Sequence, residues 1–260
     1  VGSALVPKLL DSGYRVTVLD LYLYGDHIFE KYRAHTGLKE VKGDLRHPET
    51  VKEAVAGCDA VIHLACISND PSYDLNPELG RSINYDAFRP LVKASKDSGA
   101  KRFIYASSSS VYGIKKEENV TENLTLEPLT DYSKYKAMCE DVLQKENEND
   151  FCTVTVRPST VCGYAPRLRL DLTVNILTNH AINNRKITVF GGSQMRPNIH
   201  INDMVNSYLA VLDAPSKKIN GEVIMEKAQT GYDKETGKPI FEEKRINFSS
   251  LPYIVVIIDE

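Results

Sequence analysis

The chain has 260 residues, of which 42% are hydrophobic and 26% are charged, and its formal net charge is −3. These values are typical of a globular protein, and the small charge gives no electrostatic reason to expect binding to nucleic acid or to an anionic membrane. No apolar run is long enough for a transmembrane helix, so we expect a cytoplasmic protein with no membrane partner. The five cysteines lack the spacing of metal ligands, so we expect no metal site.

The first residues look like a helix that is already in progress. Residues 1–10 are mostly apolar, and Gly13 is placed to end the helix. The first residue is Val1 and not methionine. We therefore expect the sequence to be a fragment whose true start precedes Val1.

Short apolar segments alternate with amphipathic segments along the chain. Strands are predicted over residues 16–20, 40–44, 60–65, 103–106 and 153–157. Helices are predicted over residues 48–57, 84–98 and 131–148. This alternation is typical of β-α-β units, so it predicts an α/β protein with a parallel, doubly wound sheet.

Polar side chains gather where the predicted strands end. Asp20, Asp44, His63, Ser107–Ser110 and Arg157 all lie at such ends. Ligands of doubly wound sheets bind at the carboxyl ends of the strands, so this register predicts a binding site. An acid at the end of the second strand of a dinucleotide-binding fold accepts hydrogen bonds from the adenosine ribose and repels a 2′-phosphate, so Asp20 favours NAD over NADP. An ordinary loop acid is the alternative interpretation.

The motif Tyr-x-x-x-Lys occurs twice, at Tyr112–Lys116 and at Tyr132–Lys136. The first copy lies in a loop with Gly113, where the spacing fixes no geometry. The second lies in a predicted helix, where residues four apart share a face. A nearby ammonium favours the phenolate of a tyrosine, whose free pKa is about 10, and a phenolate can take a proton from a sugar hydroxyl. A tyrosine that merely packs beside a lysine is the alternative.

Several short blocks occur in a characteristic order. They are Val1–Ser3, Gly43–Arg46, Val61–Ala65, Ser107–Gly113, Tyr132–Lys136, Arg157–Pro158 and Arg196–Asp203. Together they resemble the motifs of the NAD-dependent epimerase/dehydratase family of extended short-chain dehydrogenases/reductases, over about residues 1–222. The resemblance implies NAD as the cofactor and a Rossmann-type doubly wound parallel sheet, with the first strand missing and the small substrate-binding region truncated.

The resemblance also implies a role for each matched residue. Ser108, Tyr132 and Lys136 align with the catalytic serine, the base and its lysine partner. Asp20 and Asp44 align with contacts to the adenosine ribose and to adenine. The implied cofactor contacts are Gly2, Asp20, Asp44, Leu64, Ala65, Tyr132, Lys136 and Pro158, and the implied contacts to a nucleotide-sugar substrate are Ser108, Asn175 and Arg196. For Arg196, a surface cation is the alternative. Relatives often dimerise through the helix that carries the tyrosine, so we expect a homodimer.

The residues after Ser108 bear on the reaction. Family dehydratases carry Asp-Glu directly after the catalytic Ser/Thr, whereas this chain has Ser109–Ser110. The missing acid–base pair favours a nucleotide-sugar epimerase or a related sugar oxidoreductase, with hydride transfer at a sugar carbinol and Tyr132 as the base. A dehydratase or reductase of the same family and a non-catalytic Rossmann fragment are the alternatives.

The family pattern ends near residue 222. We therefore divide the chain into an NAD-binding Rossmann domain (1–158), a partial substrate-binding region mixed with the last Rossmann elements (159–222) and a foreign-looking tail (223–260). Residues 226–260 resemble the motor of an FtsK-type DNA translocase, which makes a DNA-motor fragment a third hypothesis. The tail lacks a proper phosphate loop, because Pro239 follows Lys238, so we predict no ATPase activity. Within the tail, residues 253–258 are predicted to form an edge strand or a buried strand. We interpret the change as a join between two sequences.

Overall fold

The structure is a computed structural model, and it describes residues 1–68, 70–148, 150–193, 195–214, 216–219, 222–225, 229–232, 239–241 and 253–257. The α-helices are α1 (Gly2–Asp11), α2 (Pro48–Val55), α3 (Asp70–Leu75), α4 (Pro77–Arg81), α5 (Phe88–Asp97), α6 (Asp131–Lys145), α7 (Thr173–Asn183) and α8 (Ile201–Asp213). Shorter helical turns are η1 (His27–Tyr32), η2 (Ser82–Asp86) and η3 (Ser109–Tyr112). Among the described residues, no helix is both long enough and apolar enough to cross a membrane.

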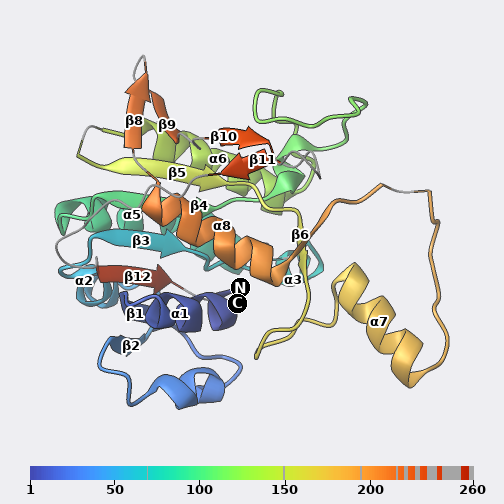
Figure 1. The fold of residues 1–260 in the computed structure, drawn as a ribbon, viewed down its shortest axis with the longest axis horizontal. Coiled ribbons are helices and arrows are strands. Elements are labelled where there is room, and N and C mark those ends of the chain that lie inside the picture. Colours follow the sequence, from blue (N-terminus) through green and yellow to red (C-terminus); the bar gives the residue numbers. More distant parts are fainter. Residues whose placement is uncertain are drawn as a thin grey trace.

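The main sheet has six parallel strands in the order β2-β1-β12-β3-β4-β5. These strands are β1 (Arg15–Asp20), β2 (Leu38–Lys42), β3 (Ala60–His63), β4 (Arg102–Ala106), β5 (Cys152–Val156) and β12 (Tyr253–Ile257). The predicted α/β fold with a parallel, doubly wound sheet is therefore confirmed. Figure 1 shows β12, in dark red, running between β1 and β3 in the middle of the sheet.

The fold prediction has the first strand missing; among the described residues no strand precedes α1, and β12 lies in the middle of the sheet. The strand predicted over residues 253–258 forms over 253–257, and it is buried in the centre of the sheet rather than at an edge. Every side chain from Ile254 to Ile257 is fully buried. These four residues are apolar and mostly β-branched, so they suit a strand that is covered on both faces. Residues 253–257 thus belong to the core of the sheet.

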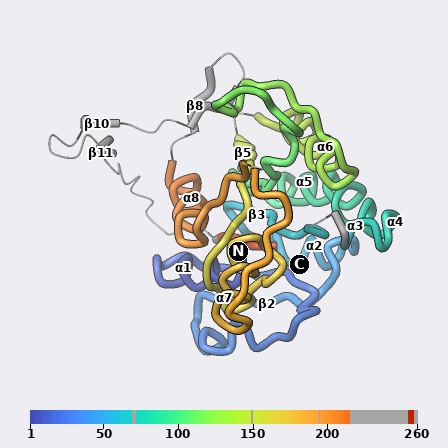
Figure 2. The backbone as a smooth tube through the Cα atoms, turned by 90° about the vertical axis from the view of Figure 1, so that its right-hand side faces the viewer, coloured from blue at the N-terminus to red at the C-terminus, as the bar shows by residue number. Residues whose placement is uncertain are grey.

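Helices cover both faces of this sheet (Figure 2). On one face α1 and α8 pack together, and their core includes Leu5, Val205, Ile254 and Val256. On the other face α2, α5 and α6 enclose a second core that includes Val51, Leu91, Leu143, Val255 and Ile257. Successive residues of β12 therefore point to opposite cores, as the pleat of a strand requires.

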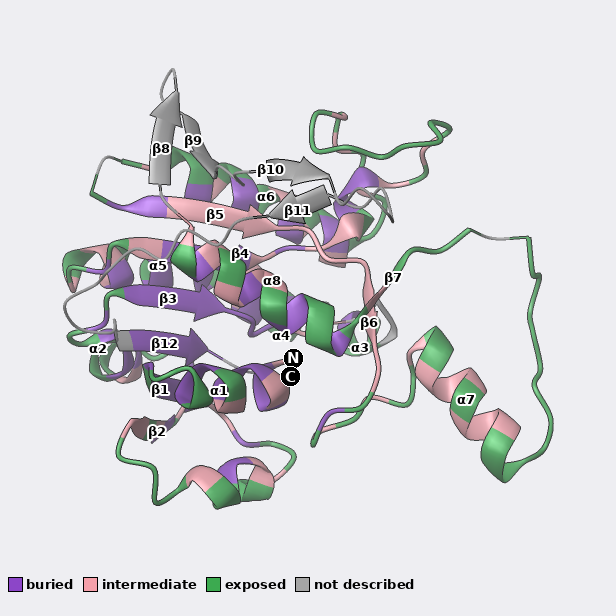
Figure 3. Ribbon diagram, viewed as in Figure 1, coloured by how far each residue is buried: buried purple, intermediate pink, exposed green. Residues whose placement is uncertain are grey.

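The remaining elements lie outside the main sheet. Strands β6 (Thr160–Cys162) and β7 (Asn198–His200) pair in parallel, while β8 (Ser216–Ile219) with β9 (Glu222–Met225) and β10 (Gln229–Tyr232) with β11 (Pro239–Phe241) form antiparallel pairs. Helix α7 and the segment after it extend away from the sheet, and α7 contains no buried residue (Figure 3). The division of the chain into three parts remains a prediction.

Candidate active site

The helix that carries Tyr132 begins at a well-defined cap. The Thr130 side chain accepts a hydrogen bond from the Ser133 backbone N–H, while the Ser133 hydroxyl accepts one from the Thr130 backbone N–H. This capping box satisfies N–H groups that would otherwise lack partners in the first turn of α6. The predicted helix over residues 131–148 is confirmed for 131–145. Tyr132 therefore lies in the first turn of a fixed helix, as its proposed role requires.

Lys136 is buried beneath Tyr132. Only 2% of its surface is exposed, and its Nζ donates a hydrogen bond to the Ala106 carbonyl oxygen over 2.6 Å. Nζ lies 5.8 Å from the ring centre of Tyr132 and 4.9 Å from that of Tyr105. Burial opposes the charge of the ammonium, but Cys66 and Tyr132 outweigh it, so the pKa of Lys136 lies above its ordinary value. Lys136 is thus a cation at neutral pH, held close to a phenol.

Ser108 follows β4 and caps the short helix η3. Its hydroxyl oxygen accepts hydrogen bonds from the backbone N–H of Ser110 over 3.2 Å and from the Ser110 hydroxyl over 2.9 Å. Helix η3 packs against α6, which carries Tyr132. Beyond η3, Gly113 has a φ of 69°, and a Cβ there would lie 2.2 Å from the Glu127 carbonyl oxygen. Only glycine fits this close passage, and it fixes the far end of the serine loop.

Asp20 lies beside a hollow at the N-terminus of α1. The lining of this hollow includes Gly2, Ser3, Asp20 and Arg167. The N-cap residue of α1 makes no side-chain capping bond, and the first turn contains no acid. A helix N-terminus of this kind favours a negatively charged group. The predicted ribose contact Asp20 and the predicted pyrophosphate contact Gly2 thus line the same hollow, and their contact with a dinucleotide remains a prediction.

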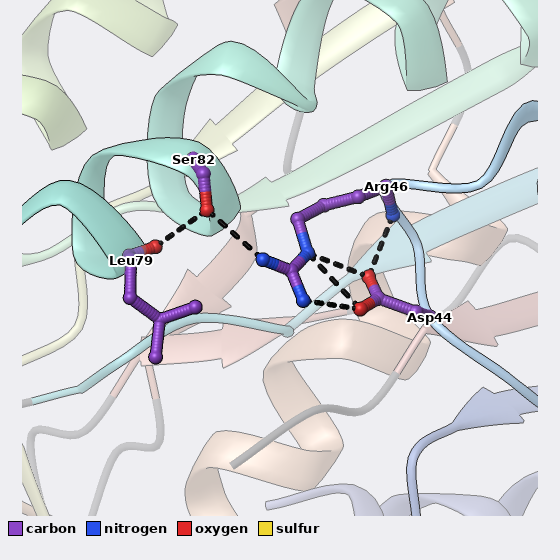
Figure 4. Close-up of polar contacts among 4 residues, drawn as sticks. All are labelled: Asp44, Arg46, Leu79 and Ser82. Carbon is purple, nitrogen blue, oxygen red and sulfur yellow. Dashed lines mark hydrogen bonds and ion pairs between the residues drawn. The ribbon is translucent and has the colours of Figure 1, made fainter.

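Asp44 is held by an arginine that the motif analysis left without a role. Arg46 donates hydrogen bonds to both carboxylate oxygens of Asp44 through its guanidinium, and to one of them through its backbone N–H as well (Figure 4). Another guanidinium nitrogen donates to the Ser82 hydroxyl over 3.2 Å. The hydrogen bonds from Arg46 hold the pKa of Asp44 below its ordinary value. Asp44 is therefore a fixed carboxylate at the end of β2.

The turn after β3 is hydrogen-bonded to β12. The backbone N–H groups of Leu64 and Ala65 both donate to the Ile257 carbonyl oxygen, over 2.9 and 3.1 Å. Leu64 and Ala65 are buried. On the neighbouring strand ends, the Pro158 carbonyl oxygen accepts a hydrogen bond from the Ser109 N–H over 2.9 Å. The predicted cofactor contacts thus lie along the carboxyl edge of one sheet, although their contact with NAD remains a prediction.

A buried histidine lies behind this site. His63 is 2% exposed, and its ring stacks on Tyr105 with a centroid distance of 5.8 Å. Burial, and secondly the charge of Lys136, lower the pKa of His63 to about 3. His63 is therefore neutral at physiological pH. Because it is enclosed by aromatic rings, we assign it to the packing beneath Lys136 and not to proton transfer.

The two predicted substrate residues are placed differently. The Asn175 side chain donates to the Arg169 carbonyl oxygen over 2.9 Å and accepts from the Gly163 N–H over 3.0 Å, so it fastens the loop before α7. Arg196 is exposed on the segment between α7 and β7, which runs outside the sheet (Figure 1). Tyr132 and Lys136 thus lie on α6, and Ser108 caps the short helix η3 that packs against α6, while the functional roles of all five residues remain predictions.

The fold and the site together define a dinucleotide-binding enzyme of the Rossmann class. The profile of the NAD dependent epimerase/dehydratase family matches residues 1–225. The chain belongs to this family of NAD-dependent enzymes, and NAD is its cofactor, as the motifs implied. The profile ends just before residue 226, and the resemblance of residues 226–260 to a DNA translocase gains no support from the comparisons.

Individual relatives agree with this assignment. The chain is 26% identical over 274 residues to the UDP-glucose 4-epimerase of Lactobacillus helveticus, covering 97% of this chain and 80% of that protein. It is 30% identical over 213 residues to the protein y4nG of Sinorhizobium fredii, covering 80% of this chain and 50% of y4nG. The crystal structure of UDP-glucuronic acid 4-epimerase from Bacillus cereus in complex with UDP-glucuronic acid and NAD superimposes with a TM-score of 0.75 at 27% identity, covering 86% of this chain and 73% of that one. The chain spans about half the length of y4nG and of YtcB of Bacillus subtilis.

Proposed function

We propose that the protein is a nucleotide-sugar 4-epimerase or a closely related sugar oxidoreductase, with Tyr132 as the base. The observation that carries the proposal is the position of the buried Lys136 ammonium. Its Nζ is hydrogen-bonded to the Ala106 carbonyl oxygen and lies 5.8 Å from the centre of the Tyr132 ring. A cation in this position favours the phenolate of Tyr132 over the neutral phenol. In a site that excludes water, such an interaction is much stronger than it is in solution.

In the proposed chemistry the hydroxyl groups of Tyr132 and Ser108 have different roles. Tyr132 takes the proton from a sugar hydroxyl, and Ser108 accepts or donates a hydrogen bond that orients this hydroxyl. Lys136 keeps the phenolate charged before the transfer and is close enough to polarise the phenol afterwards. NAD, when bound between Asp20 and Lys136, supplies the acceptor and donor of the hydride.

Two observations favour epimerisation over elimination of water. Ser109 and Ser110 follow Ser108 where a carboxylate pair would be needed, and the Ser110 hydroxyl is engaged with Ser108 over 2.9 Å. A hydroxyl at its ordinary pKa is a poor general acid or base at neutral pH. Two of the relatives described above are named 4-epimerases, one acting on UDP-glucose and one on UDP-glucuronic acid, which supports UDP-sugars as the substrate class.

The test uses the full chain, NAD, and UDP-glucose and UDP-glucuronic acid as probes. Epimerised product is measured by chromatography. We expect Tyr132→Phe to lower turnover by about 100-fold or more, the range typical of a lost general base. Tyr135→Phe is the matched control: it lies on the same helix, and its ring packs on Tyr85 at 5.4 Å and on Tyr73 at 6.0 Å. Equal turnover in the Tyr132 and Tyr135 variants would refute the assignment of the base.

A further inference from the structure

Three residues lie on one stripe of α6. Tyr132, Lys136 and Glu140 are four residues apart, so they project from the same face of the helix. The first two belong to the proposed site. Glu140 is 8% exposed, and a carboxylate buried to this degree needs partners. The partners of Glu140 connect the stripe to the two strand ends beside it.

The partners of Glu140 are the residues that directly follow β4 and β5. The Ser107 hydroxyl donates to one carboxylate oxygen of Glu140. The Arg157 guanidinium donates to both oxygens, with Nε at 3.1 and 3.0 Å and a terminal nitrogen at 2.5 Å. This is the two-pronged geometry in which an arginine–carboxylate pair is strongest. The hydrogen bond to Glu140 also holds the pKa of Arg157 above its ordinary value.

Arg157 also contacts Tyr112, at the far end of the loop that contains Ser108. Its other terminal nitrogen donates to the Tyr112 hydroxyl over 2.8 Å, and the guanidinium lies 5.0 Å from the centre of the Tyr112 ring. Ser107 and Tyr112 flank the loop that contains Ser108. One ion pair therefore holds both ends of this loop and, through Glu140, the helix that carries Tyr132.

We infer that the Glu140–Arg157 ion pair is the positioning element of the proton-transfer site, which sets the Ser108 loop against the Tyr132–Lys136 face of α6. The inference rests on the proposed function. A buried ion pair adds little net stability, because desolvation offsets the attraction between the charges, but it fixes geometry closely. Misplacement of a reacting group by about 1 Å can lower a rate by about 100-fold. A fixed geometry between two hydroxyl groups is what the proposed chemistry needs.

If the Glu140–Arg157 pair had only a packing role, its variants would change kcat, KM and the melting temperature in a different way. If the pair only stabilised the fold, its variants would lower the melting temperature and would affect substrate binding and turnover together. If it positions the loop, kcat falls while KM and the affinity for NAD change little. The conservative variant Arg157→Lys keeps the charge but loses the two-pronged geometry, so it separates charge from geometry.

The test compares Glu140→Gln, Arg157→Lys, Arg157→Met and the double variant Glu140→Gln/Arg157→Met. We expect kcat to fall about 10- to 100-fold in Glu140→Gln and Arg157→Met, with KM for the UDP-sugar within about threefold. Arg157→Lys should recover part of the loss. Because the two residues act as one unit, the double variant should be no slower than the slower single variant. NAD affinity is measured by titration calorimetry.

A second readout does not depend on turnover. Hydrogen exchange of the amides of Ser109 and Gly113, which donate to Pro158 and Ser110, reports on the loop directly. We expect exchange there to rise about 10-fold or more in Glu140→Gln. Arg102→Lys is the control, because Arg102 lies at the other end of β4 and donates to the carbonyls of Leu212 and Ala214. That variant should lose thermal stability without faster exchange in the loop.

The outcomes separate the two proposals. Unchanged loop exchange in both Glu140→Gln and Arg157→Met would overturn the positioning role, whatever happens to turnover. An equal fall in kcat for Arg102→Lys at a matched melting temperature would overturn it as well, because the effect would then be general destabilisation. Full turnover in Tyr132→Phe would instead refute the proposed function.

Discussion

The placement of β12 at the centre of the sheet predicts that two side chains near the C-terminus of the chain carry a large part of its stability. Ile254 and Ile257 are both fully buried, each with 0% accessible surface. Their side chains belong to the cores on opposite faces of the sheet. Truncating a buried isoleucine to alanine costs about 2–5 kcal/mol, since the lost burial is joined by a cavity that relaxes only in part. We therefore expect Ile254→Ala and Ile257→Ala each to destabilise the protein by that amount.

The two effects should add. Three residues along a strand span roughly 10 Å, and side chains on opposite faces share few neighbours, so additivity should hold within about 0.5 kcal/mol. The double variant would then lose roughly 4–10 kcal/mol, which approaches the whole stability of a typical domain. It should be largely unfolded in the absence of ligand. A change of this size from one short strand is expected only if that strand is central.

The assay is urea denaturation followed by circular dichroism, with the midpoint and the m-value fitted separately. Ile182→Ala on α7 makes the same chemical change at a side chain that is 61% exposed, and it should shift the free energy of unfolding by no more than about 0.5 kcal/mol. If Ile254→Ala and Ile257→Ala behave like this control, β12 does not occupy the centre of the sheet, and the reasoning is wrong.

Three further predictions concern pH and backbone geometry. The pKa of His63 is about 3 in the folded protein and about 6.5 in the unfolded chain, so the unfolded state takes up a proton first as the pH falls. The free energy of unfolding should therefore drop by roughly 1 kcal/mol between pH 6 and pH 5. Urea denaturation of His63→Phe should not show this drop. Arg46 holds the pKa of Asp44 below its ordinary value, so the interaction between the two residues stabilises the fold at neutral pH and stops doing so as the pH falls through the lowered pKa. Arg46→Gln should lower the free energy of unfolding by about 1 kcal/mol at pH 7. The same loss at pH 3 would contradict this reasoning. Gly113→Ala should lower the melting temperature measured by calorimetry, because its Cβ would lie 2.2 Å from the Glu127 carbonyl oxygen; a neutral effect would mean that the loop passes Glu127 at a greater distance.

The alternation of strands and helices was readable from the sequence because each element has its own periodicity. The apolar run that became β3 and the helix that carries Tyr132 both form where predicted. The strand of residues 253–257 was also predicted, but its place was not. A strand whose two faces are apolar fits any buried position in a parallel sheet, and only pairing with β1 and β3, far away in the sequence, selects the one it takes.

The candidate site shows the same limit. Tyr132 and Lys136 could be paired from sequence, because four-residue spacing on a helix fixes their relation. Glu140 continues the same spacing and could have been found in this way. Arg157 could not be joined to it, since their contact depends on how α6 lies on the ends of β4 and β5. Arg46 is two residues from Asp44, yet whether such neighbours pair depends on the turn after β2 and cannot be inferred from spacing alone.

The proposed cofactor site and the stability of the fold share one structural element. The last described residue of β12, Ile257, contributes its side chain to the core on one face of the sheet and its carbonyl oxygen to the backbone of Leu64 and Ala65. Without that carbonyl, two buried N–H groups would lose their partner, which is costly in a dry interior. The turn after β3 therefore keeps its shape only while β12 is in place. On the opposite side of the same strand, β12 pairs with β1, whose last residue is Asp20. Strand β12 thus sets the spacing between Asp20, the proposed ribose contact, and the turn after β3, so the geometry of the proposed cofactor site follows from the same pairing that completes the sheet.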